Sequence, residues 1–230
     1  MLTHFFAVIA SILNIHSFSF LNLSHVSDVS SDNQPREARF TVQCSEPAWV
    51  GTPGLRGGIF EGTLNANCDV ALKAVGNFTH LQNQLGSRMA NENVKVNAGP
   101  IPETYKEMPS QYFDVTMSGD GQGEHVTIDQ DIHIATNSKD LLFFDTVSRK
   151  IVGSGMSQYL LSMNAFAKVT TAATADPVDF KIEFTNSVRI KKPALVPGGM
   201  FVSKVKAQLM QVAKEQLPKL VPPLAEGLME

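Results

Sequence analysis

The side chains best suited to chemistry in this 230-residue chain lie close together in one segment. Asp129, Asp131 and His133 alternate with apolar residues, and His125 lies eight positions before His133. Imidazole and carboxylate groups together could transfer protons or hold a metal ion. A strand rises roughly 3.3 Å per residue, however, so only immediate neighbours on one face could share an ion. We therefore interpret this segment as the solvated face of a strand.

Two amides occupy positions where the same alternation predicts apolar, inward-facing side chains. Gln130 follows Ile128 by two residues, and Asn186 follows Phe184 by two residues. A buried amide costs free energy unless it is hydrogen-bonded. These amides could therefore bind a hydroxyl or carbonyl group of a ligand. The alternative is that each lies at a bulge or bonds to a neighbouring backbone group.

The two cysteines, Cys44 and Cys68, lie 24 positions apart, with no histidine or cysteine at metal-ligand spacing. They could form a disulfide if the protein is exported. The alternative is two unpaired thiols, with Cys68 at the start of a helix. The sequence contains no phosphate-binding glycine loop, serine–histidine–aspartate signature or paired-cysteine zinc motif. It therefore indicates no cofactor and no catalytic residue, and it leaves open whether the protein is an enzyme.

Composition narrows the class of protein. The chain is 43% hydrophobic and 18% charged, which is less charged than a soluble domain of average composition. Its formal net charge is −3, whereas a nucleic-acid-binding protein needs a basic face to neutralise phosphates. We therefore expect one apolar core and no nucleic-acid partner.

The first 39 residues are expected to precede the folded domain. An apolar run from Phe5 to Leu13 lies within residues 1–23, and a polar linker occupies residues 24–39. This order is typical of a signal peptide, which predicts the secretory pathway or another extracytoplasmic location. The segment around Ser17-Phe18 also resembles precursors sent to the plastid of an alga with a secondary plastid. A hydrophobic tail that is not removed is the remaining alternative.

Residues 40–230 are predicted to form one domain of strands closed by a long helix. Sharp period-two alternation over 112–118, 126–134 and 180–190 predicts half-buried antiparallel strands. A first strand over 58–66 and two further strands over 139–148 and 159–170 are also expected.

Two helical segments are expected. Asn67 or Asp69 would cap a helix that begins at residue 70 and runs towards Leu85, broken into short pieces by glycines. A longer helix follows from an apolar stripe at spacings of three and four, formed by Phe201, Val205, Leu209, Val212 and Gln216. Pro218 is expected to end or kink this helix, and Pro222-Pro223 to close whatever follows.

Two segments resemble a known family. Residues 67–81, with a polar cap and then Asn77-Phe78-Thr79-His80-Leu81, are similar to the opening of the START-like superfamily, also called SRPBCC or polyketide cyclase/dehydrase-like. Residues 186–193, followed by Gly198-Gly199-Met200-Phe201, look like the last strand and the entry to the closing helix of bacterial-type members. The resemblance covers residues 59–217 and depends mainly on the order of elements.

The resemblance implies an α+β helix-grip fold, in which a curved antiparallel sheet wraps around a long C-terminal helix, with short helices after the first strand. It also implies a cavity between sheet and helix that binds a lipid, sterol, pigment or polyketide-like molecule, as in a carrier or sensor. The residues expected to line this cavity are Phe113, Val115, Met117, Ile128, Gln130, Ile132, Phe180, Phe184, Asn186, Phe201, Val205 and Leu209.

Three functions remain open at this stage. The first is non-enzymatic binding of an apolar molecule, which the amides on the inward faces favour. The second is a cyclase or dehydrase that uses the same cavity, and the third is an interaction or assembly role with a filled cavity. Five cations, Arg189, Lys191, Lys192, Lys204 and Lys206, lie around the entry to the last helix. They form either a solvated rim or a contact with an anionic membrane surface.

Overall fold

The computed structural model describes residues 40–72, 77–91, 108–121, 124–137, 141–155, 157–172 and 178–229. The predicted targeting segment and linker lie outside these residues.

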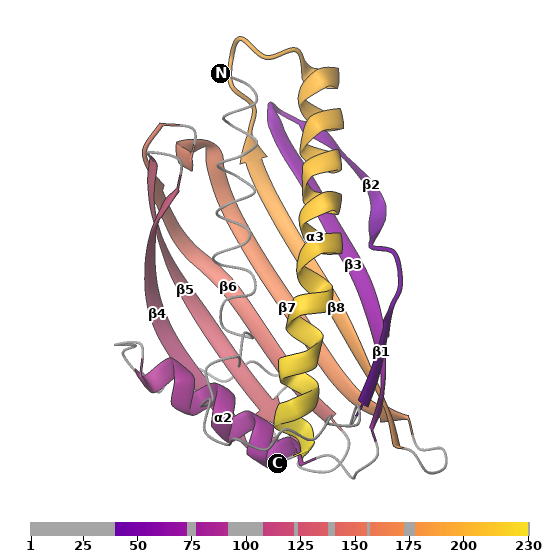
Figure 1. Ribbon diagram of the computed structural model, residues 1–230. Helices are drawn as coiled ribbons and strands as arrows, with labels where there is room; N and C mark the ends of the chain where they lie inside the picture. Colours follow the sequence, from indigo (N-terminus) through magenta and orange to yellow (C-terminus); the bar gives the residue numbers. More distant parts are fainter. Residues whose placement is uncertain are drawn as a thin grey trace, which may run out of the picture.

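Eight strands form one antiparallel sheet (Figure 1). Across the sheet the order is β1-β3-β8-β7-β6-β5-β4, and β2 pairs with the same edge of β3 as β1 does. The sheet therefore has seven positions across its width. The strands are β1 (Phe40–Cys44), β2 (Ala48–Arg56), β3 (Ile59–Leu72), β4 (Ser110–Gly121), β5 (Glu124–Thr136), β6 (Leu141–Gly153), β7 (Leu160–Ala172) and β8 (Val178–Lys191).

Two α-helices lie against one face of the curved sheet. The helix α3 (Gly198–Met229) runs along this face above β3, β7 and β8, and α2 (Phe78–Asn91) crosses the lower end beside β5 (Figure 1). A single 3-10 turn, η3 (Ser157–Tyr159), joins β6 to β7. The predicted fold class is confirmed by this order of elements, a curved antiparallel sheet against a long C-terminal helix.

The predicted strands are confirmed, and most are longer than their alternation indicated. The hairpin between β4 and β5 is paired as far as Gly121 and Glu124. The turn predicted at Gly153-Ser154-Gly155 follows β6. A second hairpin joins β2 to β3 through Gly57 and Gly58, whose φ angles of 56° and 79° favour glycine.

The helix predicted from residue 70 is wrong, because β3 continues to Leu72. Ala66, Cys68 and Val70 face inward with a period of two and are buried against β8. Pairing with β8 along fourteen residues outweighs the helix signal of the polar side chains between them. The helix begins instead at Phe78, where the side-chain oxygen of Asn77 accepts a hydrogen bond from the backbone N–H of His80 at 3.0 Å.

The prediction that α3 ends near Pro218 and Pro222-Pro223 is also wrong, since the helix continues to Met229. A second apolar stripe carries it past the prolines, and its members are buried: Leu217, Val221, Leu224, Ala225 and Leu228. Packing of this stripe outweighs the backbone hydrogen bonds that proline cannot donate.

The core has two parts, which correspond to the two halves of α3. The upper core packs Phe201, Val205, Leu209 and Val212 of α3 against Phe60 and its neighbours in the sheet. The lower core packs the second half of α3 and the inner side of α2 against the sheet, and Phe78 and Phe180 are in ring contact there at 5.6 Å. Between the two parts lies the region in which side chains are smallest.

Candidate ligand site beneath the C-terminal helix

A small apolar pocket lies between the sheet and the middle of α3. Its free volume is about 30 Å³, roughly the share of one water molecule in the liquid. Its walls come from β3, β6, β7, β8 and α3, and include Leu64, Ala66, Phe144, Ala165, Ala167, Phe184, Asn186, Ala213 and Leu217.

The register of the strands explains why space remains here. Phe184 of β8 pairs with Ala66 of β3 on one side and with Ala167 of β7 on the other. The helix presents Ala213 to the same pocket. A phenylalanine flanked by alanines leaves gaps beside its ring, because a methyl group cannot fill the width that a larger side chain would occupy.

A second pocket of about 30 Å³ adjoins the first towards the upper core. It is lined by Trp49, Leu64, Asn186, Val188, Leu209, Val212 and Ala213. Leu64, Asn186 and Ala213 line both pockets. The amide of Asn186 is therefore a polar group set between two apolar spaces, an arrangement typical of sites that orient an apolar ligand.

The structure divides the twelve predicted cavity residues into three groups. Phe184, Asn186 and Leu209 line the pockets. The others whose side chains are described lie in the buried core: Phe113, Val115, Ile132 and Phe180 in its lower part, Ile128, Phe201 and Val205 in its upper part, and Gln130 on β5. Met117 belongs to β4, and its side chain lies outside the described residues.

The buried amide of Gln130 coincides with an irregularity in the sheet. Only 2% of the residue is exposed, and the pairing of β5 with β6 shifts register between Asp129 and Gln130. This matches the alternative that the sequence left open for this residue, a position at a bulge. Bulges redirect side chains within a strand.

Hydroxyl groups are the other polar side chains on the inner face of the neighbouring strands. The hydroxyl of Thr146 accepts a hydrogen bond from the backbone N–H of Ala165 at 3.1 Å. The hydroxyl of Ser148 accepts one from the backbone N–H of Met163 at 2.9 Å. Both hydroxyls thus replace missing strand pairing between β6 and β7. Between Val126 and Ile134, the inward polar side chain of β5 is the amide of Gln130.

The opposite face of the sheet carries a network of charged residues across β4, β5 and β6. The hydroxyl of Tyr112 donates a hydrogen bond to Asp131 at 2.5 Å. Arg149 forms ion pairs with Asp114 and with Asp131, the latter at 3.2 Å. Burial, together with the hydrogen bond to Asp131, raises the pKa of Tyr112 to about 12. The network thus joins three strands through one guanidinium group.

His133 is more enclosed than the predicted solvated strand face would allow. Only 9% of the residue is exposed, and its ring lies 4.7 Å from that of Tyr112. Burial lowers the pKa of His133, and burial raises the pKa of Asp145, which lies opposite it on β6. Asp129 keeps the predicted exposed environment, where it accepts a hydrogen bond from Thr116 at 2.7 Å. No group in the described ranges brings together three or more metal-binding side chains.

No protein-family model and no curated protein matches the sequence. Solved structures with a similar fold include a START superfamily protein from Mycobacterium smegmatis, with 12% identity over 75% of this chain and 97% of that one, at a TM-score of 0.32. The lipid transfer and protein localization domain of human StarD13 shares 11% identity over 79% and 89% of the two chains, at a TM-score of 0.34. The Zhui aromatase/cyclase from a Streptomyces species shares 8% identity over 74% and 92%, at a TM-score of 0.30.

These structures come from the superfamily that the sequence resembles. At such identities the similarity concerns the fold, and the strand order described above is what establishes the architecture of this chain. Among the described helices, none combines the length and the apolar composition needed to cross a membrane.

Proposed function

We propose that this protein binds an apolar small molecule between the sheet and α3, as a carrier or sensor. The observation that carries this proposal is the position of Asn186, whose amide lines two adjoining apolar pockets. An apolar wall supplies affinity for an alkyl or ring system, and a single amide can orient a hydroxyl or carbonyl group. The inward amides and hydroxyls suit binding better than acid–base chemistry, which needs an ionisable group.

A bound ligand of ordinary size requires more space than the two pockets provide. Ligand sites typically have volumes of roughly 300–1,000 Å³, whereas each pocket here has about 30 Å³. Binding therefore requires α3 to move away from β7 and β8, or the side chains of Phe184 and Leu209 to change rotamer. A ligand that enters in this way would separate the upper and lower cores.

The small volume also supports a second candidate, in which the interior is filled and the protein acts through its surface in an assembly. The Cys44–Cys68 disulfide supports a location outside the reducing cytosol for either function. The proposed setting is the secretory pathway or another extracytoplasmic space, with the plastid of an alga as the alternative.

Native mass spectrometry of the protein isolated from its source tests the proposal. We expect a stoichiometric apolar compound that solvent extraction releases and identifies. Substituting Ala213→Leu should fill both pockets from the helix side and abolish occupancy, whereas Asn186→Leu should weaken binding by about ten-fold through loss of a hydrogen bond.

The matched control is Ala207→Leu, which makes the same change at an exposed position of α3. It should leave occupancy unchanged. A protein that carries no compound and takes none up from a lipid extract would exclude the carrier function and favour the filled interior. Occupancy that survives Ala213→Leu would place the ligand elsewhere.

A further inference from the structure

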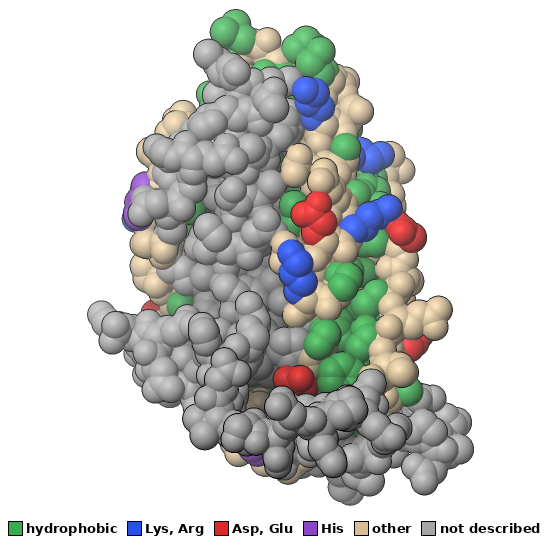
Figure 2. Space-filling model, in the orientation of Figure 1, with side chains coloured by type: hydrophobic (Ala, Val, Ile, Leu, Met, Phe, Trp, Pro, Cys, Tyr) green, Lys and Arg blue, Asp and Glu red, His purple; other side chains and the backbone are tan. Residues whose placement is uncertain are grey.

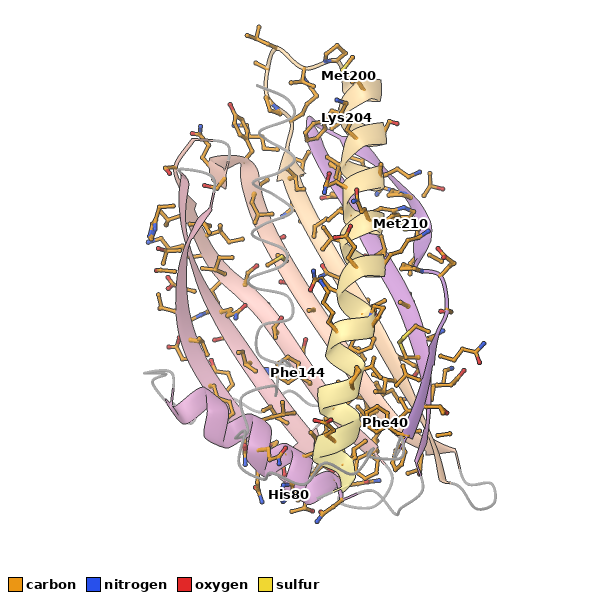
Figure 3. All side chains as sticks on the ribbon, viewed as in Figure 1. Phe40, His80, Phe144, Met200, Lys204 and Met210 are labelled. Atoms are coloured by element: carbon orange, nitrogen blue, oxygen red, sulfur yellow. A yellow bond between two sulfur atoms is a disulfide. The ribbon has the colours of Figure 1, made fainter. Side chains whose placement is uncertain are left out.

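The turn between β8 and α3 presents apolar side chains to solvent at one end of the molecule. Leu195 is 97% exposed in this turn, and Met200, in the first turn of α3, is 50% exposed. Figure 2 shows hydrophobic side chains at this end, with a basic side chain beside them, and Figure 3 places Met200 and Lys204 on the same end of the helix. We call residues 193–200 the apical turn.

The apical turn is held in place from inside. The Lys192 ammonium group donates hydrogen bonds to the carbonyl groups of Pro193, Ala194 and Val196 at 3.0, 3.4 and 2.8 Å. The backbone N–H of Lys192 donates to Gly58 at 2.8 Å, which ties the turn to the β2–β3 hairpin. Leu195 therefore projects from a supported turn, which lowers the entropy cost of inserting it into another phase.

Charge on this end of the molecule has one sign. Residues 189–206 include Arg189, Lys191, Lys192, Lys204 and Lys206 and no acidic residue, although the whole chain has a net charge of −3. Two of the cations are already engaged inside the protein, Lys192 by the turn and Arg189 by Glu61 at 3.0 Å. The side chains of Lys191 and Lys204 are exposed, and that of Lys206 is half-buried beside an open depression formed by Leu55, Gly198 and Val202.

We propose that the apical turn docks on an anionic lipid bilayer. Leu195 and Met200 would enter the interfacial region, and Lys191, Lys204 and Lys206 would contact the headgroups. A bilayer fits this surface because insertion of two apolar side chains and attraction of a few cations act together at a membrane interface. The proposal does not depend on an occupied ligand pocket.

Two other occupants fit the surface less well. A second copy of this chain, related by a two-fold axis, would bring the same lysines opposite one another, and like charges repel. A folded protein partner needs about 800 Å² of complementary surface. Two projecting side chains beside a shallow depression suit a deformable interface better than a rigid one.

Vesicle co-sedimentation of the 230-residue chain tests docking. We expect binding to phosphatidylcholine vesicles that contain 30% phosphatidylserine, with at least ten-fold loss when salt is raised from about 0.1 to 1 M. The double variant Leu195→Glu/Met200→Glu should bind at least ten-fold more weakly. The double variant Lys191→Gln/Lys204→Gln should lose roughly five-fold per cation on the anionic vesicles and little on pure phosphatidylcholine.

Val50→Glu provides the matched control, since Val50 is 51% exposed but pairs with Thr63, away from the β2–β3 hairpin. Its binding should equal that of the unmodified chain. Docking by the apical turn is overturned if Leu195→Glu/Met200→Glu binds normally, or if Val50→Glu loses as much. Light scattering that shows a dimer dissociated by Leu195→Glu would assign the surface to a second copy instead. Native mass spectrometry of Leu195→Glu/Met200→Glu keeps this test separate from ligand binding, because its pocket is unchanged.

Discussion

Cys44 and Cys68 lie directly opposite each other on β1 and β3 and are joined by a disulfide. Cys68 is completely buried in the lower core, so the bond attaches the edge strand β1 to the interior of the domain. The sequence left a disulfide and two thiols as alternatives, and the structure selects the disulfide. The bond also encloses β2, whose Trp49 lies over Gly62 so closely that a side chain at that glycine would collide with it.

Reducing this disulfide should destabilise the protein measurably. The two cysteines are 24 positions apart, and closing a loop of that length lowers the unfolded-state entropy by an amount worth about 3 kcal/mol. Urea unfolding with and without reductant measures the difference. Cys44→Ser should show the lower stability under both conditions. Equal stability of the oxidised and reduced forms would mean that β1 adds nothing to the cooperative unit.

Local alternation predicted the strands that pair in the middle of the sheet, because one face of each is packed and the other is polar. The end of β3 and both prolines of α3 show where local signals fail. Asp69 resembles a helix cap until β8 is known to pair beside it. Pro218 resembles a helix end until the sheet and α2 are known to cover Leu217 and Val221.

The candidate site was predictable only in its polar part. Asn186 stands out in the sequence because it interrupts an apolar face. Ala66, Ala167 and Ala213 create the pocket by being small, and nothing in their own segments distinguishes them from ordinary core residues. Their meaning depends on the register that places two of them on either side of Phe184.

The last turns of α3 should contribute strongly to stability, contrary to what their prolines suggest. Leu224 is buried, and the carbonyl group of Leu228 accepts a hydrogen bond from the backbone N–H of Asn77 at 2.7 Å. Leu224→Ala should lower the free energy of unfolding by about 3 kcal/mol, through lost burial and a residual cavity. Glu226→Ala, exposed on the same turn, should change it by less than about 0.5 kcal/mol. Urea unfolding of the two variants makes the comparison, and similar midpoints would show that this end of the helix frays.

Stability should fall on mild acidification because of His133. Burial lowers its pKa in the folded protein below the ordinary value of 6.5. Below about pH 6.5 the unfolded chain therefore takes up a proton that the folded protein resists, so unfolding becomes more favourable. Asp145, whose pKa is raised, acts with the opposite sign, since its effect develops as the pH rises above 3.8.

Urea midpoints at pH 7.5 and 5.5 measure this effect. His133→Gln should reduce the difference between the two midpoints, whereas His125→Gln, at an exposed position of the same strand, should leave it unchanged. If both variants retain the full difference, the acid sensitivity belongs to other groups and the burial of His133 carries no protonation cost.

The phenol of Tyr112 should ionise well above the range of an ordinary tyrosine. Its hydroxyl donates to the carboxylate of Asp131, and removing that proton would leave two anions 2.5 Å apart in a partly buried position. These effects raise its pKa to about 12. The ultraviolet absorbance of tyrosinate, titrated in the unmodified protein and in Tyr112→Phe, isolates this group among the three tyrosines of the chain. The difference between the two curves should remain near zero up to about pH 11. A difference that is half complete near pH 10 would show that the Tyr112–Asp131 hydrogen bond is absent in solution, and Arg149 would then be the only link among the three strands of this network.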